Sequence, residues 1–136
     1  MTRQLAAFAL LIAALCPWPA MAQLSPLFAA TTTPFLNMTT ATTTRIVTGV
    51  ANKSTYIINL RYIANGTTTF KLVTGTGTNC GTGTADLTET WDLTAQAGAA
   101  YSGALGPVVV AAAALDICVV NSAAVNLRVG LAAAQF

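Results

Sequence analysis

The residues best suited to chemistry are three carboxylates close together in the chain, Asp86, Glu89 and Asp92. If this segment curls, their oxygens could surround a calcium ion, which prefers several oxygen ligands. Two of them could instead act as an acid–base pair on a glycosidic bond. A third interpretation is a solvated strand edge, where charges discourage pairing with another sheet. We expect the solvated edge, and calcium is the candidate metal.

Aromatic residues form the second group of candidates for ligand binding. Trp91, Tyr56 and Tyr62 could present ring faces to a sugar, with Tyr101 as a further member. Aromatic rings of this kind combine an apolar face with a polar tip. The competing interpretation is core packing, because Tyr56 and Tyr62 share one face of a predicted strand with Leu60. A carbohydrate ligand is therefore an alternative that the sequence leaves open.

Several kinds of catalysis are excluded by residue type. The chain contains no histidine, which removes Ser-His-Asp and Cys-His nucleophiles and the usual zinc ligand sets. Lys53 and Ser54 are neighbours, and neighbours on a strand point to opposite faces. The glycine-rich segment 75–83 lacks the Gly-Lys-Ser/Thr ending of a phosphate-binding loop. We predict no enzymatic activity and no cofactor.

The first 22 residues have the pattern of a secretory signal peptide. Arg3 precedes an apolar run at residues 5–15, and Ala-Met-Ala at 20–22 resembles a signal-peptidase site. We predict cleavage before Gln23 and an exported protein that is periplasmic, secreted or attached to the cell surface. Two alternatives stay open: an uncleaved anchor helix, and a lipid attached to Cys16.

Cysteine number predicts one disulfide bond. Cys16 leaves with the signal peptide, so Cys80 and Cys118 remain. Two cysteines in an exported chain are expected to pair, whereas two free thiols would require a reducing compartment. The bridge would close a loop of about 39 residues and contribute roughly 3–4 kcal/mol by restricting the unfolded chain.

Composition limits the partners. Only 7 % of residues are charged and 54 % are hydrophobic, whereas an average soluble domain has roughly 25 % charged residues. Outside the N-terminus the longest apolar run is Val108 to Leu115, far short of the ~20 residues of a membrane-spanning helix. No basic cluster is present to bind nucleic acid. A protein partner or self-association is the expected mode of interaction.

Alternating residues predict strands over most of the chain. Ser54 to Ala64 is the clearest, with residues 56, 58, 60 and 62 on one face and Arg61 on the other. Asn65-Gly66 is the strongest turn signal, and residues 67–74 return as a second strand. The pattern predicts a hairpin over about 54–74.

Seven or eight short strands predict an all-β domain, an antiparallel β-sandwich or a jelly-roll-like fold, over residues 43–136. The further predicted strands cover 45–50, 88–94, 115–121 and 124–134, and residues 108–113 are a buried strand or a short helix, which periodicity does not distinguish. Residues 23–42 contain Pro26, Pro34 and runs of threonine. We interpret them as an extended arm outside the sandwich, which could add a strand to a neighbouring subunit's sheet.

Several short motifs carry a resemblance. They are Cys80-Gly-Thr-Gly-Thr, Leu115-Asp-Ile-Cys118 and the final Gln135-Phe136. Over about residues 42–136 the chain resembles small disulfide-containing β-rich proteins encoded by tailed phages, prophages and their bacterial hosts. The resemblance implies a non-enzymatic sandwich at a virion or cell surface. Ala134 departs from the aromatic neighbourhood expected before Gln-Phe, and a signal peptide suits a host-exported protein better than a capsid component.

These observations together predict an exported, non-enzymatic structural or protein-interaction module. The alternative is a carbohydrate-binding module that uses Trp91 and a tyrosine, with calcium held by the three carboxylates.

Overall fold

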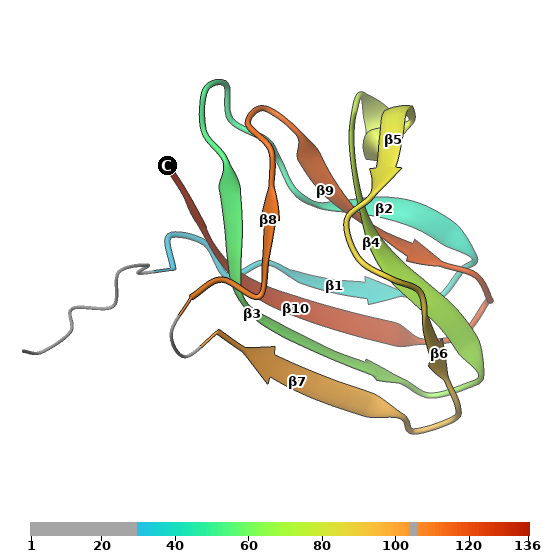
Figure 1. Ribbon diagram of the computed structural model, residues 1–136. Helices are drawn as coiled ribbons and strands as arrows, with labels where there is room; N and C mark the ends of the chain where they lie inside the picture. The colour runs from blue at the N-terminus through green and yellow to red at the C-terminus, as the bar shows by residue number, and fades with distance from the viewer. Residues whose placement is uncertain (1–29, 104–105) are drawn as a thin grey trace, which may run out of the picture.

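A computed structural model describes residues 30–103 and 106–136. The predicted signal peptide, its cleavage site and residues 23–29 of the predicted arm lie outside the described residues. The described part contains ten strands and one short 3-10 turn, Thr78–Cys80 (Figure 1). The strands are β1 Phe35–Met38, β2 Thr42–Val47, β3 Thr55–Ala64, β4 Thr68–Thr76, β5 Thr82–Asp86, β6 Trp91–Leu93, β7 Gly98–Ser102, β8 Val109–Ala111, β9 Asp116–Asn121 and β10 Leu127–Gln135.

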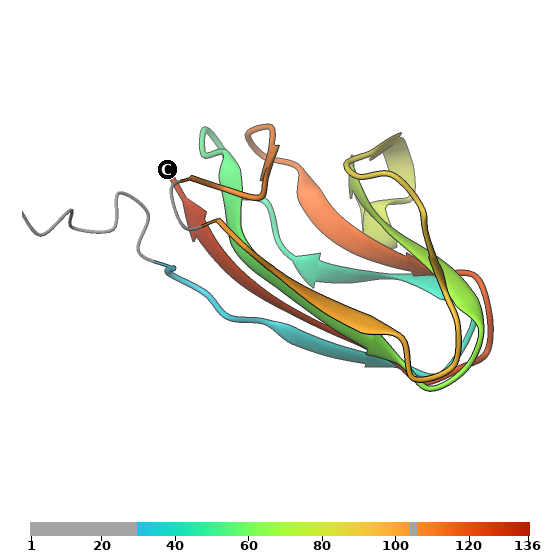
Figure 2. The ribbon, with the colours of Figure 1, turned by 60° about the horizontal axis from the view of Figure 1, so that its bottom comes forward.

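The strands form two antiparallel sheets that pack face to face (Figure 2). The first sheet has the order β1-β10-β3, and β7 and β8 share its far edge because both pair with β3. The second sheet has the order β2-β9-β4, and β5 and β6 share its far edge beside β4. If each shared edge is counted as one broken strand, eight strands follow the order of a jelly roll. The predicted all-β sandwich is therefore confirmed.

Apolar side chains from both inner faces fill the space between the sheets. The alternation of each strand sends every second residue inward, and each large apolar side chain that is buried contributes roughly 1.5–3 kcal/mol. The largest fully buried apolar side chains of this core are Phe70, Ile57, Leu60, Leu72, Ile117, Leu127, Val119 and Val129. Val73 is also fully buried, but it packs with Cys80 and Cys118 in a separate cluster.

The regular alternation expected along β3 is wrong because the ladder contains a bulge. The pairing of β3 with β10 slips by one residue, which leaves Ile58 as an extra residue. Such a bulge reverses the alternation on one side of it. As a result Ile57, rather than Ile58, is buried in the same core as Leu60 and Tyr62, and Tyr56 does not join them.

The hairpin predicted over 54–74 is also wrong. β3 belongs to the first sheet and β4 to the second, so Asn65-Gly66 turns the chain from one sheet to the other. The turn packs on a second turn near the end of the chain. Asn65 Oδ1 accepts a hydrogen bond from the Asn126 N–H at 2.8 Å, and a Cβ atom on Gly66 would lie 2.7 Å from Val125.

The described part of the predicted arm is an edge strand of the sandwich. β1 pairs with β10 in register from Phe35 opposite Gly130, and Thr32 forms a further bridge to Ala133. Leu36 packs against the core, but Pro34 and the surrounding threonines hide this strand in the sequence. The sandwich thus begins before residue 43. The paired residues are engaged within their own chain and do not form a free donor strand.

The glycine-rich segment is ordered as a hairpin between β4 and β5. Cys80 in its 3-10 turn forms the predicted disulfide bond with Cys118 on β9, with a Cα–Cα distance of 6.2 Å. Asn79 and Cys80 both have positive φ angles, 51° and 58°. Left-handed backbone costs a non-glycine residue roughly 1–2 kcal/mol, and the covalent bond to a buried strand holds this turn in place.

Candidate ligand-binding cleft

A cleft of about 470 Å³ opens between the two sheets where both shared edges are broken. On the second sheet the break is the segment 87–90 between β5 and β6, and on the first sheet it lies between the end of β7 at Ser102 and the start of β8 at Val109. Ile57, Leu60 and Leu72 form the apolar floor of the cleft. The cleft is therefore an opening into the hydrophobic core. Its lining comes from the edges formed by β5 with β6 and by β7 with β8, and in the two sheets these edges lie opposite the edge strands β2 and β1 (Figure 1).

Hydrogen bonds to Leu72 produce the break in the second sheet. Its carbonyl oxygen accepts from the N–H groups of both Leu87 and Thr88, at 2.9 and 3.2 Å. Its N–H donates to the hydroxyl of Thr88 at 3.0 Å. The Thr88 side chain thus replaces a backbone acceptor, the ladder stops, and the segment places Leu87, Thr88 and Glu89 along the cleft.

The bulge in β3 coincides with the break in the first sheet. Gly103 N–H donates to the Ile58 carbonyl at 2.8 Å, and Val108 N–H donates to the Ile57 carbonyl at 2.6 Å. Two adjacent carbonyls of β3 therefore bind residues five apart in the chain. Tyr101 near the end of β7 and Val108 just before β8 line the cleft and are 41 % and 37 % exposed.

Four aromatic rings run from the core to the mouth of the cleft. Tyr62 contacts the buried Phe70 edge-on, with ring centroids 4.4 Å apart. Trp91 stacks on Phe70 at 4.8 Å. Trp91 and Tyr101 lie 6.3 Å apart with planes inclined by 25°. Trp91 is half-buried and Tyr101 exposed, so these two offer ring surface to a ligand.

The two tyrosine hydroxyl groups approach each other at 3.5 Å, Tyr62 Oη to Tyr101 Oη. Burial raises the pKa of Tyr62 well above its ordinary value, and the hydrogen bond to Tyr101 and that residue's charge when ionised raise it further. The Tyr62 hydroxyl therefore remains protonated in neutral solution. It can position Tyr101, but it offers no base.

The structure brings together two of the three predicted aromatic site residues. Trp91 and Tyr62 have ring centroids 5.7 Å apart, and Tyr101 joins them. Tyr56 lies elsewhere, with its ring 5.7 Å from that of Phe136, because the bulge at Ile58 turns it out of line with Tyr62. The sequence gives no sign that Val108 lines the same cleft as Trp91 and Tyr101, because its position depends on how β8 pairs with β3.

The three predicted calcium ligands are not brought together. Among the residues that the structure describes, no group of three or more His, Cys, Asp or Glu side chains is placed to hold a metal ion. Asp86 forms an ion pair with Lys71 at 2.5 Å. Glu89 lines the cleft, and Asp92 lines a separate shallow pocket beside Ser122. The break between β5 and β6 separates carboxylates that are close in the chain.

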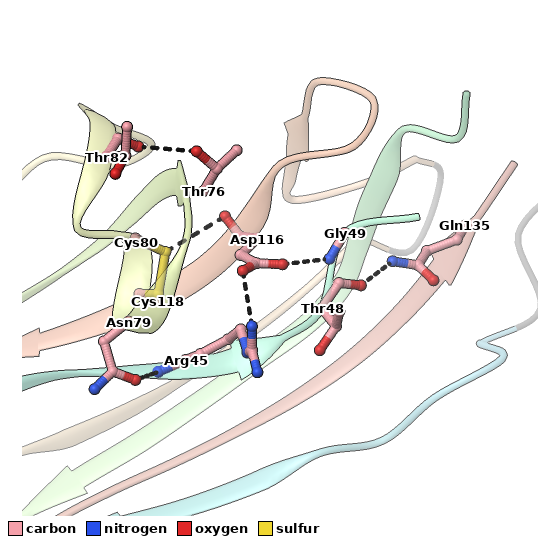
Figure 3. A network of polar contacts seen from close by, with 10 residues as sticks. All are labelled: Arg45, Thr48, Gly49, Thr76, Asn79, Cys80, Thr82, Asp116, Cys118 and Gln135. Carbon is pink, nitrogen blue, oxygen red and sulfur yellow. Dashed lines mark hydrogen bonds and ion pairs between the residues drawn. A yellow bond between two sulfur atoms is a disulfide. The ribbon is translucent and has the colours of Figure 1, made fainter. Parts of the chain in front are cut away.

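A second group of polar side chains surrounds the disulfide bond (Figure 3). Asp116 accepts hydrogen bonds from the Arg45 guanidinium at 3.0 Å and from the Gly49 N–H at 2.8 Å. Asn79 Oδ1 accepts from the Arg45 N–H at 3.2 Å. The Asp116 side chain is only 10 % exposed, and both of its oxygens are used. This network ties β2 and the 3-10 turn to β9, so we assign it to the fold.

No protein-family model, curated protein or solved structure matches this chain. The resemblance to phage and prophage proteins therefore stays a prediction. Within residues 30–103 and 106–136, no helix has the length and apolar character needed to cross a membrane. The disulfide bond fits an exported protein, because such bonds persist in oxidising compartments.

Proposed function

We propose that this chain is a non-enzymatic, exported interaction module at a cell or virion surface, and that its cleft holds an apolar group of a protein partner. The observation that carries the proposal is the opening of the hydrophobic core between two broken edges. Protein interiors are normally packed with few voids larger than a water molecule. A cleft of about 470 Å³ with an apolar floor lies within the range of ligand sites.

The side chains at the mouth of the cleft suit a protein partner. Exposed aromatic residues are enriched in the centres of protein interfaces, where they combine apolar area with a polar tip. Tyr101 and Val108 offer apolar surface, and Thr88 and Glu89 supply a small number of polar groups beside it. This combination can anchor one apolar side chain of a partner and orient the atoms around it.

Photo-crosslinking from the mouth of the cleft tests the proposal. A photoreactive phenylalanine analogue is introduced at Val108, which lines the cleft, or at Val110, which is 45 % exposed and lies outside the lining. We expect irradiation of the native exported fraction to give a defined protein adduct from position 108 and none from position 110. The proposal is wrong if position 108 gives no protein adduct, or if both positions give the same products.

A carbohydrate ligand is the second candidate, and the nearly parallel rings of Trp91 and Tyr101 favour it. In a chain without residues 1–22, Trp91 is the only tryptophan, so intrinsic fluorescence reports on the cleft alone. A glycan array followed by fluorescence titration decides this candidate. Saturable quenching by an oligosaccharide, weakened in Tyr101→Ala and retained in Tyr56→Ala, would show that the cleft binds a glycan rather than a protein partner.

A further inference from the structure

Some charged residues of the described part form salt bridges, and the others do not and lie in separate basic and acidic groups. The salt bridges of the described residues are Arg45–Asp116 and Lys71–Asp86. They pair the two basic residues of the second sheet, Arg45 and Lys71. Among the described residues, three basic side chains, Lys53, Arg61 and Arg128, and two acidic ones, Glu89 and Asp92, form no salt bridge. Of these, Arg61 and Arg128 lie on the first sheet, and both acidic residues lie in or beside β6 of the second.

The two arginines share the outer face of the first sheet. The register places Phe35 opposite Gly130 and Gly130 opposite Arg61, and in the next row Arg128 lies opposite Ile63. Phe35 and Ile63 are 59 % and 45 % exposed. We call Phe35, Arg61, Ile63 and Arg128 the arginine face. The described strands of this sheet carry no carboxylate on it.

Gly130 keeps the arginine face flat. A Cβ atom at this position would lie 2.8 Å from Arg61 Nε and 3.3 Å from its Cγ. The Arg61 side chain therefore lies along the sheet over Gly130, on the row that leads to Phe35. The exposed Phe35 and the guanidinium group of Arg61 lie on the same row of the sheet, so the face combines apolar area with positive charge.

The mouth of the cleft has the complementary properties. Glu89 lines the cleft with the exposed apolar surfaces of Tyr101 and Val108. Asp92 is exposed on the outer face of β6, next to Trp91 of the cleft, where it lines the separate pocket beside Ser122. We call Glu89, Tyr101 and Val108, with Asp92 on the adjacent outer face of β6, the acidic mouth. It combines apolar area with negative charge, as the arginine face combines apolar area with positive charge. The two surfaces involve different strands, so one molecule can use both at once.

We propose that the arginine face of one copy docks on the acidic mouth of a second copy. This inference rests on the proposed function and names the partner as the chain itself. Because the two surfaces differ, the contact is heterologous and adds copies head to tail, as in a filament or a ring. Complementary charges of this kind set specificity and association rate, and salt screens them.

Charge reversal and mixing test the docking. One variant carries Arg61→Glu with Arg128→Glu, and a second carries Glu89→Lys with Asp92→Lys. We expect the wild-type chain to form larger species as its concentration rises in low salt. These species should dissociate near 1 M salt, where the screening length is about 3 Å. Each variant alone should associate at least about tenfold more weakly, because like charges then face each other.

An equimolar mixture of the two variants is the decisive arm. The first variant has two acidic surfaces and the second has two basic surfaces, so they should associate with each other in alternation. Light scattering measures the mass, and circular dichroism checks that both variants are folded. Lys53→Glu is the matched control, because it makes the same charge change at an exposed turn. It should leave association at the wild-type level, whereas the single variant Arg61→Glu should weaken it. If either double variant does not fold, the neutral pairs Arg61→Gln with Arg128→Gln and Glu89→Gln with Asp92→Asn take its place and should each weaken association.

A wild-type chain that remains monomeric in low salt would overturn the docking, as would folded variants whose mixture does not associate, or neutral pairs that associate like the wild type. The crosslink from position 108 separates this failure from failure of the proposed function. An adduct with a different protein would leave the proposed function standing and remove only self-docking.

Discussion

The hairpin at the disulfide bond and the cleft are both places where a regular β-ladder stops, but the chain treats them differently. At the hairpin, Cys80 is bonded to Cys118, and Asp116 engages Arg45 and Gly49. At the cleft, Glu89 forms no salt bridge within the described residues, and the Tyr101 ring is exposed. An interruption that serves the fold is crosslinked and has its polar groups paired. An interruption left open with apolar and polar groups exposed is available for binding.

Of the variants that test this comparison, the one without the disulfide bond should lose the most stability. Replacing Cys80 and Cys118 by serine should lower the free energy of unfolding by about 2–5 kcal/mol, because the unfolded chain regains conformational entropy. Urea denaturation, followed by Trp91 fluorescence, measures the loss. When the double variant is folded, its cleft should bind ligands as the wild-type cleft does. A loss of ligand binding in the folded double variant would show that the two regions are not separate.

Asp116 should give the next largest effect. Asp116→Ala removes the acceptor for both the Arg45 guanidinium and the Gly49 N–H, and hydrogen bonds to charged groups contribute roughly 1.5–3 kcal/mol. Asp116→Asn should lose less, because an amide oxygen can still accept from Gly49 and an ion pair with an exposed arginine is weak. Denaturation of both variants tests the order. Asp92→Asn, which alters an exposed carboxylate, is the control and should change stability little.

The buried hydroxyl of Tyr62 predicts a dependence on high pH. Its pKa is raised in the folded chain, so this contribution to stability is complete below the ordinary tyrosine pKa of about 10 and is lost as pH rises above it. The slope for one proton is at most about 1.4 kcal/mol per pH unit. Tyr62→Phe should flatten the decline in unfolding free energy above pH 10 relative to the wild-type chain. Equal slopes in Tyr62→Phe and the wild-type chain would argue against a buried Tyr62 hydroxyl.

Glu89→Gln should have the smallest effect on stability. The side chain is exposed and has no salt bridge in the described part of the chain, so the unfolding free energy should change by less than about 0.5 kcal/mol. A larger loss would mean that Glu89, like Asp116, stabilises the folded state. Differential scanning calorimetry of Glu89→Gln and Asp116→Asn side by side makes this comparison.

Much of the architecture could be predicted from local signals. Alternation identified β3 and β10, an apolar run around Cys118 identified β9, and two cysteines in an exported chain identified the bridge. The breaks were not predictable, because they depend on pairing between distant strands. The bulge at Ile58 exists only in the register with β10, and Asn65-Gly66 signals a turn without saying whether it joins strands of one sheet or crosses between two.

The candidate site was predictable only in part for the same reason. Trp91 and Tyr62 were identified as ligand-binding candidates by residue type, and they do meet. The floor at Leu72 and the contribution of Val108 arise from hydrogen bonds between segments far apart in the chain. The three carboxylates are the opposite case. They are close in the sequence, but the break in the ladder between β5 and β6 keeps them apart.

Binding of a neutral apolar dye such as Nile red to the native chain, without residues 1–22, tests most directly whether the cleft is an open apolar site. We expect saturable binding to one site with quenching of Trp91, strongly weakened by Val108→Asp and unchanged by Val110→Asp. Absence of saturable binding, or equal weakening by the two substitutions, would contradict the assignment of the cleft as the binding site.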